Sequence, residues 1–144
     1  MKHLIACLLL ASLALPIAAR DDRNLYPIKD ALNANAEGKL DPDIRLFFAG
    51  QKHPAVNKKI GEWKTNKKTN AFNKSDQEAC EWTFLSALLE LQERARKEGG
   101  NAVINIKSNY KNIEHSSPSE YMCGNGALMA GVALKSTVVN LSGK

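Results

Sequence analysis

The strongest periodic pattern of apolar positions lies between residues 75 and 98, and it predicts a long amphipathic helix. Ser75 and Glu78 form a capping box at its start, and Gly99-Gly100 ends it. Apolar residues recur at spacings of three and four, which is typical of one buried helix face. This stripe consists of Cys80, Phe84, Ala87, Leu88, Leu91 and Ala95, widened by Trp82, Leu85 and Leu89.

Compact apolar runs elsewhere predict strands. Residues 44–49 and 101–107 have the apolar centres of strands and are bounded by turn-forming residues. Residues 121–139 form a longer apolar stretch, in which Gly124 and Gly126 permit a bend or bulge and residues 127–134 are the expected strand core.

The N-terminal part of this domain has weaker signals. Residues 20–24 are polar, and we expect a frayed start there. Pro27 in a first-turn position and Gly38 as a stop suggest a short helix between them. The order of elements predicts an α+β fold, in which one long helix packs on a mostly antiparallel sheet within a single domain of residues 20–144.

The segment 51–74 differs from the rest in charge. Its seven lysines face one acidic residue, Glu62, which gives a local charge of +6 within a chain of net charge +5. One interpretation is a solvated edge strand or hairpin that lysines protect from aggregation. The other is a binding patch for an acidic partner protein or an anionic surface. The candidate binding residues are Lys52, Lys58, Lys59, Lys64, Lys67, Lys68 and Lys74.

Residues 1–19 have the composition of a secretory signal peptide. Lys2 precedes an apolar stretch that ends at Pro16 and small residues, so we expect cleavage after Ala19 and a periplasmic or secreted protein. The apolar stretch is shorter than the roughly 20 residues of a membrane span, so we expect no stable membrane anchor. Only three residues precede the lipid-box-like segment that ends at Cys7, so we interpret Cys7 as part of the signal.

The exported chain then has two cysteines, Cys80 and Cys123. An even number in an oxidising compartment favours one disulfide bond. The alternative is a metal site formed by both cysteines with His53 and His115, although no two of these residues have the close spacing of zinc ligands.

Motifs of catalysis and nucleotide binding are missing from the sequence. It contains neither the phosphate loop GxxxxGK[ST] nor the nucleophile motif GxSxG. His53 and His115, the histidines of the exported chain, lie in loop-like surroundings and read as surface residues. We therefore expect a protein that is not an enzyme and carries no cofactor. Few aromatic residues accompany the lysines, so we expect no nucleic-acid partner.

A family resemblance covers residues 80–138. It is carried by Gly100-Asn101-Ala102-Val103-Ile104, by Cys123 and by ALMAGVAL at 127–134. These residues resemble the periplasmic domain of the RcsF stress-sensor lipoproteins and, more loosely, the YbjQ-like domains that are labelled as heavy-metal-binding. The resemblance implies an RcsF/YbjQ-like fold with a Cys80–Cys123 disulfide. A second RcsF disulfide would fall on Ser108 and Met129, so both of its cysteines are absent together.

Over its full length the chain is similar to small exported bacterial proteins that often carry the label "excinuclease ATPase subunit". Residues 68–76 together with Cys80 and Trp82 carry this likeness. The missing phosphate loop contradicts the label. We therefore expect a non-enzymatic binding domain that contacts an envelope protein or senses stress, with a metal-binding domain using Cys80, Cys123 and His115 as the alternative.

Overall fold

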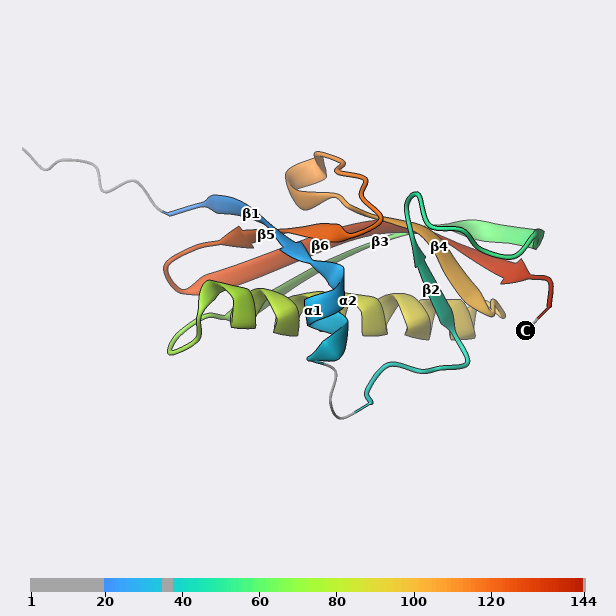
Figure 1. Cartoon of the computed structure of the whole chain (residues 1–144), viewed down its shortest axis with the longest axis horizontal. Coiled ribbons are helices and arrows are strands. Elements are labelled where there is room, and N and C mark those ends of the chain that lie inside the picture. Colours follow the sequence, from blue (N-terminus) through green and yellow to red (C-terminus); the bar gives the residue numbers. More distant parts are fainter. Residues whose placement is uncertain (1–19, 35–37, 144) are drawn as a thin grey trace, which may run out of the picture.

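The computed structural model describes residues 20–34 and 38–143 (Figure 1), so the expected signal peptide and its cleavage point lie outside the described residues. The elements, in chain order, are β1 (Asp22–Pro27), α1 (Ile28–Asn33), β2 (Arg45–Phe48), β3 (Val56–Asn70), α2 (Asp76–Lys97), β4 (Ala102–Ser108), the 3-10 turn η1 (Tyr110–Asn112), β5 (Glu120–Asn125) and β6 (Met129–Leu141).

Strand β6 is the centre of a six-stranded sheet. β3 pairs with β6 along one edge, whereas β5 and β4 pair with the beginning and the later part of its other edge. β1 continues the sheet beyond β5, and β2 continues it beyond β4. Only the β2–β4 pair is parallel among the described strands. The predicted α+β class with a mostly antiparallel sheet is therefore confirmed.

Helix α2 runs along one face of the sheet (Figure 1) and supplies much of the core. Its start is capped as predicted, because the Ser75 side chain accepts a hydrogen bond from the Glu78 amide at 3.0 Å. The ring of Phe84 stacks on that of Tyr121 in β5, with centroids 3.9 Å apart. All six residues of the predicted stripe are at most 1% exposed: Cys80, Phe84, Ala87, Leu88, Leu91 and Ala95.

Trp82 corrects one detail of that prediction, because its side chain is 56% exposed. Two residues after Cys80, it points about 200° away around the helix, which turns it from the core. The ammonium group of Lys39 lies 4.7 Å from its ring centroid. Leu85 and Leu89 lie at the margin of the stripe and are half-buried.

Two expectations about strands were wrong. The polar start is not frayed, because Asp22–Pro27 forms β1 and pairs with β5. The stretch 121–139 is not one strand with a bend but a hairpin, in which the Gly126 amide donates to the Met129 carbonyl at 2.8 Å. The strand β1 and the β5–β6 hairpin both depend on pairing between strands. Apolar periodicity within a single segment does not reveal such pairing.

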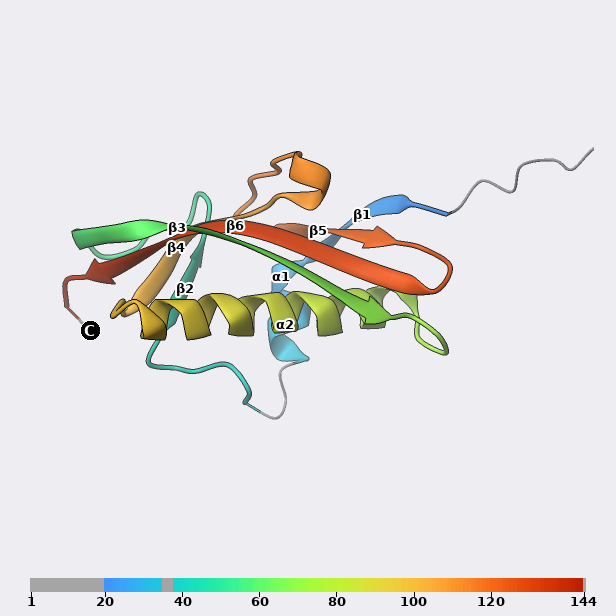
Figure 2. The same ribbon diagram turned by 180° about the vertical axis from the view of Figure 1, so that it is seen from behind.

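The basic segment forms one strand of 15 residues, β3, rather than a hairpin. It lies beside β6 in both views (Figure 1 and Figure 2). Within residues 20–34 and 38–143, no strand pairs with the opposite edge of β3. The basic segment is thus an edge strand of the sheet, a position that both interpretations of its lysines allow.

The sheet face opposite α2, here called the outer face, is covered in part by the loop that contains η1 (Figure 1). Tyr110 of η1 lies directly over Gly124, where a Cβ atom would come within 2.1 Å of the ring. The Tyr110 hydroxyl donates to Asp21 at 3.0 Å, which ties the loop to the beginning of the described chain. Glycine at position 124 is therefore required for this loop to pack on the sheet.

Candidate anion-binding surface

The alternation of side chains along β3 separates the lysines that the sequence groups together. Successive side chains of a strand point to opposite faces. Lys67 lies on the α2 side, where its ammonium group is 2.5 Å from Glu90. Lys64 and Lys68 point to the outer face and are exposed. Two lysines of the predicted patch therefore share the outer face, and Lys67 belongs to the other.

The remaining lysines of the segment lie further away along the chain. Lys59 is 3.9 Å from Glu62, and Lys74 donates to the backbone carbonyl of Asn70 at 3.0 Å. Lys52 lies in the connection before β3, and Lys58 near its beginning. The seven predicted residues do not form one surface.

Strand register instead builds a row of three lysines across the outer face. Lys64 of β3 lies opposite Lys135 of β6, and Lys135 lies opposite Lys107 of β4. Directly opposite residues have Cβ atoms about 4.5–5.5 Å apart and lie on the same face. The side chains of Lys107 and Lys135 are 19% and 28% exposed, so their ammonium groups emerge from half-buried stems. We call Lys64, Lys135 and Lys107 the lysine row.

Like charges in this arrangement repel one another, and Glu114 offsets part of the repulsion. One carboxylate oxygen of Glu114 accepts a hydrogen bond from Lys135 at 2.8 Å, and the other lies 3.4 Å from Lys107. The Lys135 hydrogen bond and the Lys107 charge hold the pKa of Glu114 below its usual value. Glu114 in turn raises the pKa of Lys135. Lys64 makes no ion pair with another described residue.

A bulge in β4 sets this register. One additional residue enters β4 between Ile104 and Lys107, where Asn105 has a left-handed φ of 51°. Such a bulge bends a strand and changes the direction of the side chains that follow. It brings Lys107 directly opposite Lys135.

The hollow beside the row is small. Its volume is about 40 Å³, and it is lined by Glu62, Asn105, Lys107, Lys135, Ser136 and Thr137. Pockets for small-molecule ligands usually measure roughly 300–1,000 Å³. This hollow can admit water or one small charged group. The lysine row is therefore suited to contact a charged surface rather than to enclose a metabolite.

A wider hollow of about 480 Å³ lies between α1 and β2. Its lining is mainly apolar, with Leu32, Leu40 and Leu46 among its residues. Asp41 at its margin accepts a hydrogen bond from Arg96 at 2.8 Å, which holds the pKa of that carboxyl below its usual value. This hollow offers an open apolar groove without a nucleophile and base in contact.

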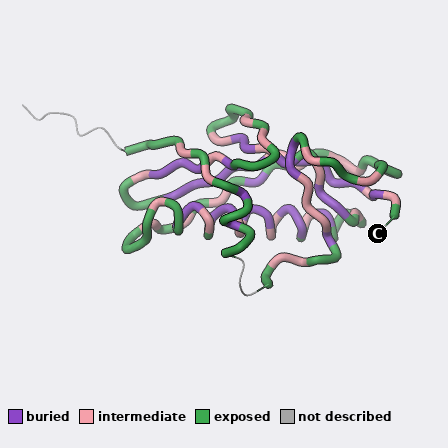
Figure 3. The backbone as a smooth tube through the Cα atoms, viewed as in Figure 1, coloured by how far each residue is buried: buried purple, intermediate pink, exposed green. Residues whose placement is uncertain are grey.

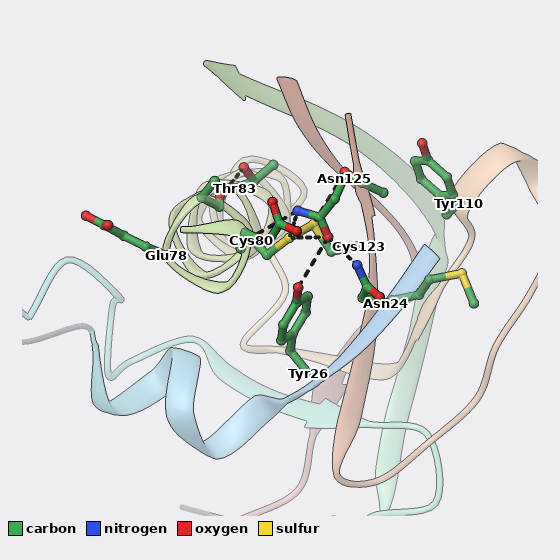
Figure 4. Close-up of a disulfide and its surroundings, with 12 residues drawn as sticks. Asn24, Tyr26, Glu78, Cys80, Thr83, Tyr110, Cys123 and Asn125 are labelled. Carbon is green, nitrogen blue, oxygen red and sulfur yellow. Dashed lines mark hydrogen bonds between the residues drawn. A yellow bond between two sulfur atoms is a disulfide. The ribbon is translucent and has the colours of Figure 1, made fainter. Parts of the chain in front are cut away.

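The disulfide joins Cys80 of α2 to Cys123 of β5, and both residues are fully buried (Figure 4). The Asn125 side chain lies beside it: its oxygen accepts from Asn24 at 2.8 Å, and its amide donates to the Cys80 sulfur at 3.1 Å. Tyr26 also donates to the Asn125 oxygen, at 3.3 Å. The predicted pairing is confirmed, and the bond ties the long helix to the sheet.

The ligands proposed for the alternative metal site do not come together in the structure. Both cysteine sulfurs are used in the disulfide, and His115 pairs through its backbone with Ser108. His53 lies in an exposed connection, with its Nδ1 atom 2.8 Å from the Pro54 carbonyl. Across the part of the chain that the structure describes, no group of three or more His, Cys, Asp or Glu side chains could hold a metal ion.

Lys107, Lys135 and Glu114 are the candidate residues that sequence reasoning missed. Each is an ordinary charged residue in its own segment, and they meet only through the pairing of β4 with β6 and the loop before β5. No local sequence signal could have found them.

None of the helices in the described ranges is both long enough and apolar enough to cross a membrane.

In comparisons with known proteins, the chain matches no family model, no curated protein and no solved structure.

Proposed function

We propose that the chain is a non-enzymatic binding domain, exported to the periplasm or beyond, whose outer sheet face binds an acidic segment of an envelope protein. The observation that carries this proposal is the lysine row, in which Lys64, Lys135 and Lys107 lie opposite one another on one face. Lys68 adds a fourth positive charge on that face. A charged row without a deep pocket favours recognition of a charged protein surface over catalysis on a small molecule.

Charge balance supports an acidic partner. The outer face brings Lys64, Lys68, Lys107 and Lys135 together with two carboxylates, Glu62 and Glu114. The carboxylate of Glu114 already occupies a position between two ammonium groups. We infer that a partner's carboxylate would bind in the same way and would compete with Glu114 for Lys135.

Two further features support export and a relation to RcsF/YbjQ-like domains. A buried disulfide suits an oxidising compartment, as does the signal-like sequence of residues 1–19. The disulfide joins the long helix to a following strand, which agrees with what the resemblance to RcsF implies. A stress-sensing role is therefore part of this proposal. The metal-binding alternative requires free thiols at Cys80 and Cys123. Elemental analysis and a thiol count of protein purified without reductant or added oxidant distinguish it: stoichiometric metal with two free thiols would favour that alternative, and an intact disulfide without metal would exclude it.

Isothermal titration with a poly-glutamate peptide at low salt tests the lysine row. We expect Lys64→Glu to weaken binding about tenfold, because it replaces an exposed cation of the row by an anion. Lys58→Glu is the matched control, since it makes the same charge change near the beginning of the same strand. We expect Glu114→Gln to strengthen binding, because it releases Lys107 and Lys135, whereas Glu120→Gln should leave binding nearly unchanged.

Photo-crosslinking from position 64 in intact cells then identifies the envelope partner. Equal weakening by Lys64→Glu and Lys58→Glu would show that net charge alone drives the binding, and it would refute a specific role for the row. A Glu114→Gln variant that binds no better than wild type would likewise contradict the proposed competition.

A further inference from the structure

We propose that one end of the domain docks on an anionic lipid bilayer, with Phe72, Leu128 and Met129 entering the headgroup region. We call these three residues the apolar tip. This surface lies at an end of the sheet, does not include the lysine row and does not depend on its function.

Two turns bring the apolar tip together. The turn between β3 and α2 and the turn between β5 and β6 lie at the same end of the molecule (Figure 1 and Figure 2). Met129 lies opposite Asn70, and the Ala71 amide donates to the Leu128 carbonyl at 2.8 Å. Phe72 and Leu128 are 67% and 66% exposed, and Met129 is 46% exposed. The two turns thus bring three exposed apolar residues to one end of the molecule, where the tube of Figure 3 is mainly exposed.

Local hydrogen bonds hold Phe72 in this exposed position. The Phe72 amide donates to the side chain of Asn70 at 2.7 Å, and the Lys74 amide donates to the Ala71 carbonyl at 3.2 Å. Asn73 adopts a left-handed φ of 59°, which asparagine tolerates better than most residues. The turn therefore orders the phenyl ring toward solvent without folding it onto the core.

The two segments that form the apolar tip carry only positive charges, and Asp22, which lies opposite Asn125 beside the β5–β6 turn, is paired with Arg20. Within residues 68–75 and 126–131, the charged residues are Lys68 and Lys74, and neither segment contains an acid. The nearest following acid, Asp76, is paired with Arg20. Apolar side chains flanked by lysines are typical of surfaces that bind the interface of anionic membranes.

The beginning of the described chain lies at the same end of the domain as the apolar tip. The carbonyl oxygen of Arg20 lies beside the β5–β6 turn, 3.3 Å from where a Cβ atom of Gly126 would be. The residues before Arg20 contain the apolar stretch of the expected signal peptide. The described chain therefore begins at the end of the domain that carries the apolar tip.

Vesicle co-sedimentation tests the proposal, with protein purified from the exported fraction in every case. Vesicles of phosphatidylethanolamine and phosphatidylglycerol should bind the wild type more strongly than vesicles of phosphatidylcholine. We expect the variant F72S/L128S to lower the partition coefficient for the anionic vesicles about tenfold. Lys74→Glu should reduce the preference for phosphatidylglycerol. Ile113→Ser is the matched control, because Ile113 is 50% exposed on the η1 loop, outside the apolar tip.

A second measurement reports insertion directly. In the variant Phe72→Trp, brominated lipids should quench the added fluorescence beyond the quenching that Trp63 and Trp82 show in wild-type protein. Circular dichroism confirms that each variant is folded. The proposal is overturned if the wild type does not bind anionic vesicles, if F72S/L128S binds as well as the wild type, or if Ile113→Ser weakens binding equally. Absence of additional quenching in Phe72→Trp also overturns it.

Discussion

Removal of the disulfide should cost the domain a large part of its stability. Cys80 and Cys123 are separated by 43 positions, and closing a loop of this length in the unfolded chain is worth about 4 kcal/mol on the chain-entropy estimate. In the variant C80A/C123A, the Asn125 amide also loses the sulfur that accepts from it, which adds about 1 kcal/mol. Single domains are stable by about 5–15 kcal/mol, so a loss of about 5 kcal/mol leaves the variant marginal.

Urea denaturation followed by circular dichroism measures this loss as a difference in the free energy of unfolding. Reductant should lower the stability of the wild type toward that of C80A/C123A and leave the variant unchanged. The reasoning is refuted if the variant unfolds within about 1 kcal/mol of the wild type. It is also refuted if mass spectrometry of the purified protein without reductant finds free thiols at Cys80 and Cys123.

Two other substitutions test the packing around β5. The Tyr121 hydroxyl is buried without a hydrogen-bond partner among the described residues, so Tyr121→Phe should raise the free energy of unfolding by about 1 kcal/mol. Burial raises the pKa of the Tyr121 hydroxyl, so the unfolded chain loses this proton at a lower pH than the folded chain, and the wild type should lose stability as the pH rises above about 10. Tyr121→Phe should reduce this loss of stability at high pH. If urea titrations show the same pH dependence for the variant and the wild type, burial of the Tyr121 hydroxyl is not its cause. Gly124→Ala should destabilise by about 1–3 kcal/mol, because its Cβ would overlap the Tyr110 ring, and thermal unfolding should show a much smaller cost in the Tyr110→Ala background.

Sequence patterns within one segment predict those elements whose capping and packing signals all lie within that segment. The helix α2 is the clearest case, because its cap at Ser75, its buried stripe and its glycine stop all lie within one segment. The prediction that Trp82 widens the buried stripe was wrong, because Trp82 is close to the stripe residues in sequence but lies on another face of the helix. Strand β1 was missed because its partner, β5, lies almost 100 residues later, as in the pair Asn24 and Cys123. Propensity within a polar segment cannot indicate such a partner.

Of the three residues of the lysine row, only Lys64 could be predicted from the sequence. Lys64 belongs to a segment whose charge is visible in the sequence, whereas Lys135 and Lys107 join it through register. A shift of one residue would turn the side chains of a strand to the other face, and the bulge at Asn105 makes such a shift within β4. The disulfide could be predicted without register, because residues 20–144 contain only two cysteines.

The central position of β6 determines when the domain can fold. β3, β4 and β5 all pair with β6, yet β6 (Met129–Leu141) follows all three of them along the chain. Until it emerges, β1–β5 and β2–β4 are unconnected pairs, and β3 has no partner among the described strands. Pairing across a long sequence separation, as between β3 and β6, slows folding. The strands that precede β6 therefore stay without their central strand while they are synthesised, and the complete sheet assembles only after β6 has followed.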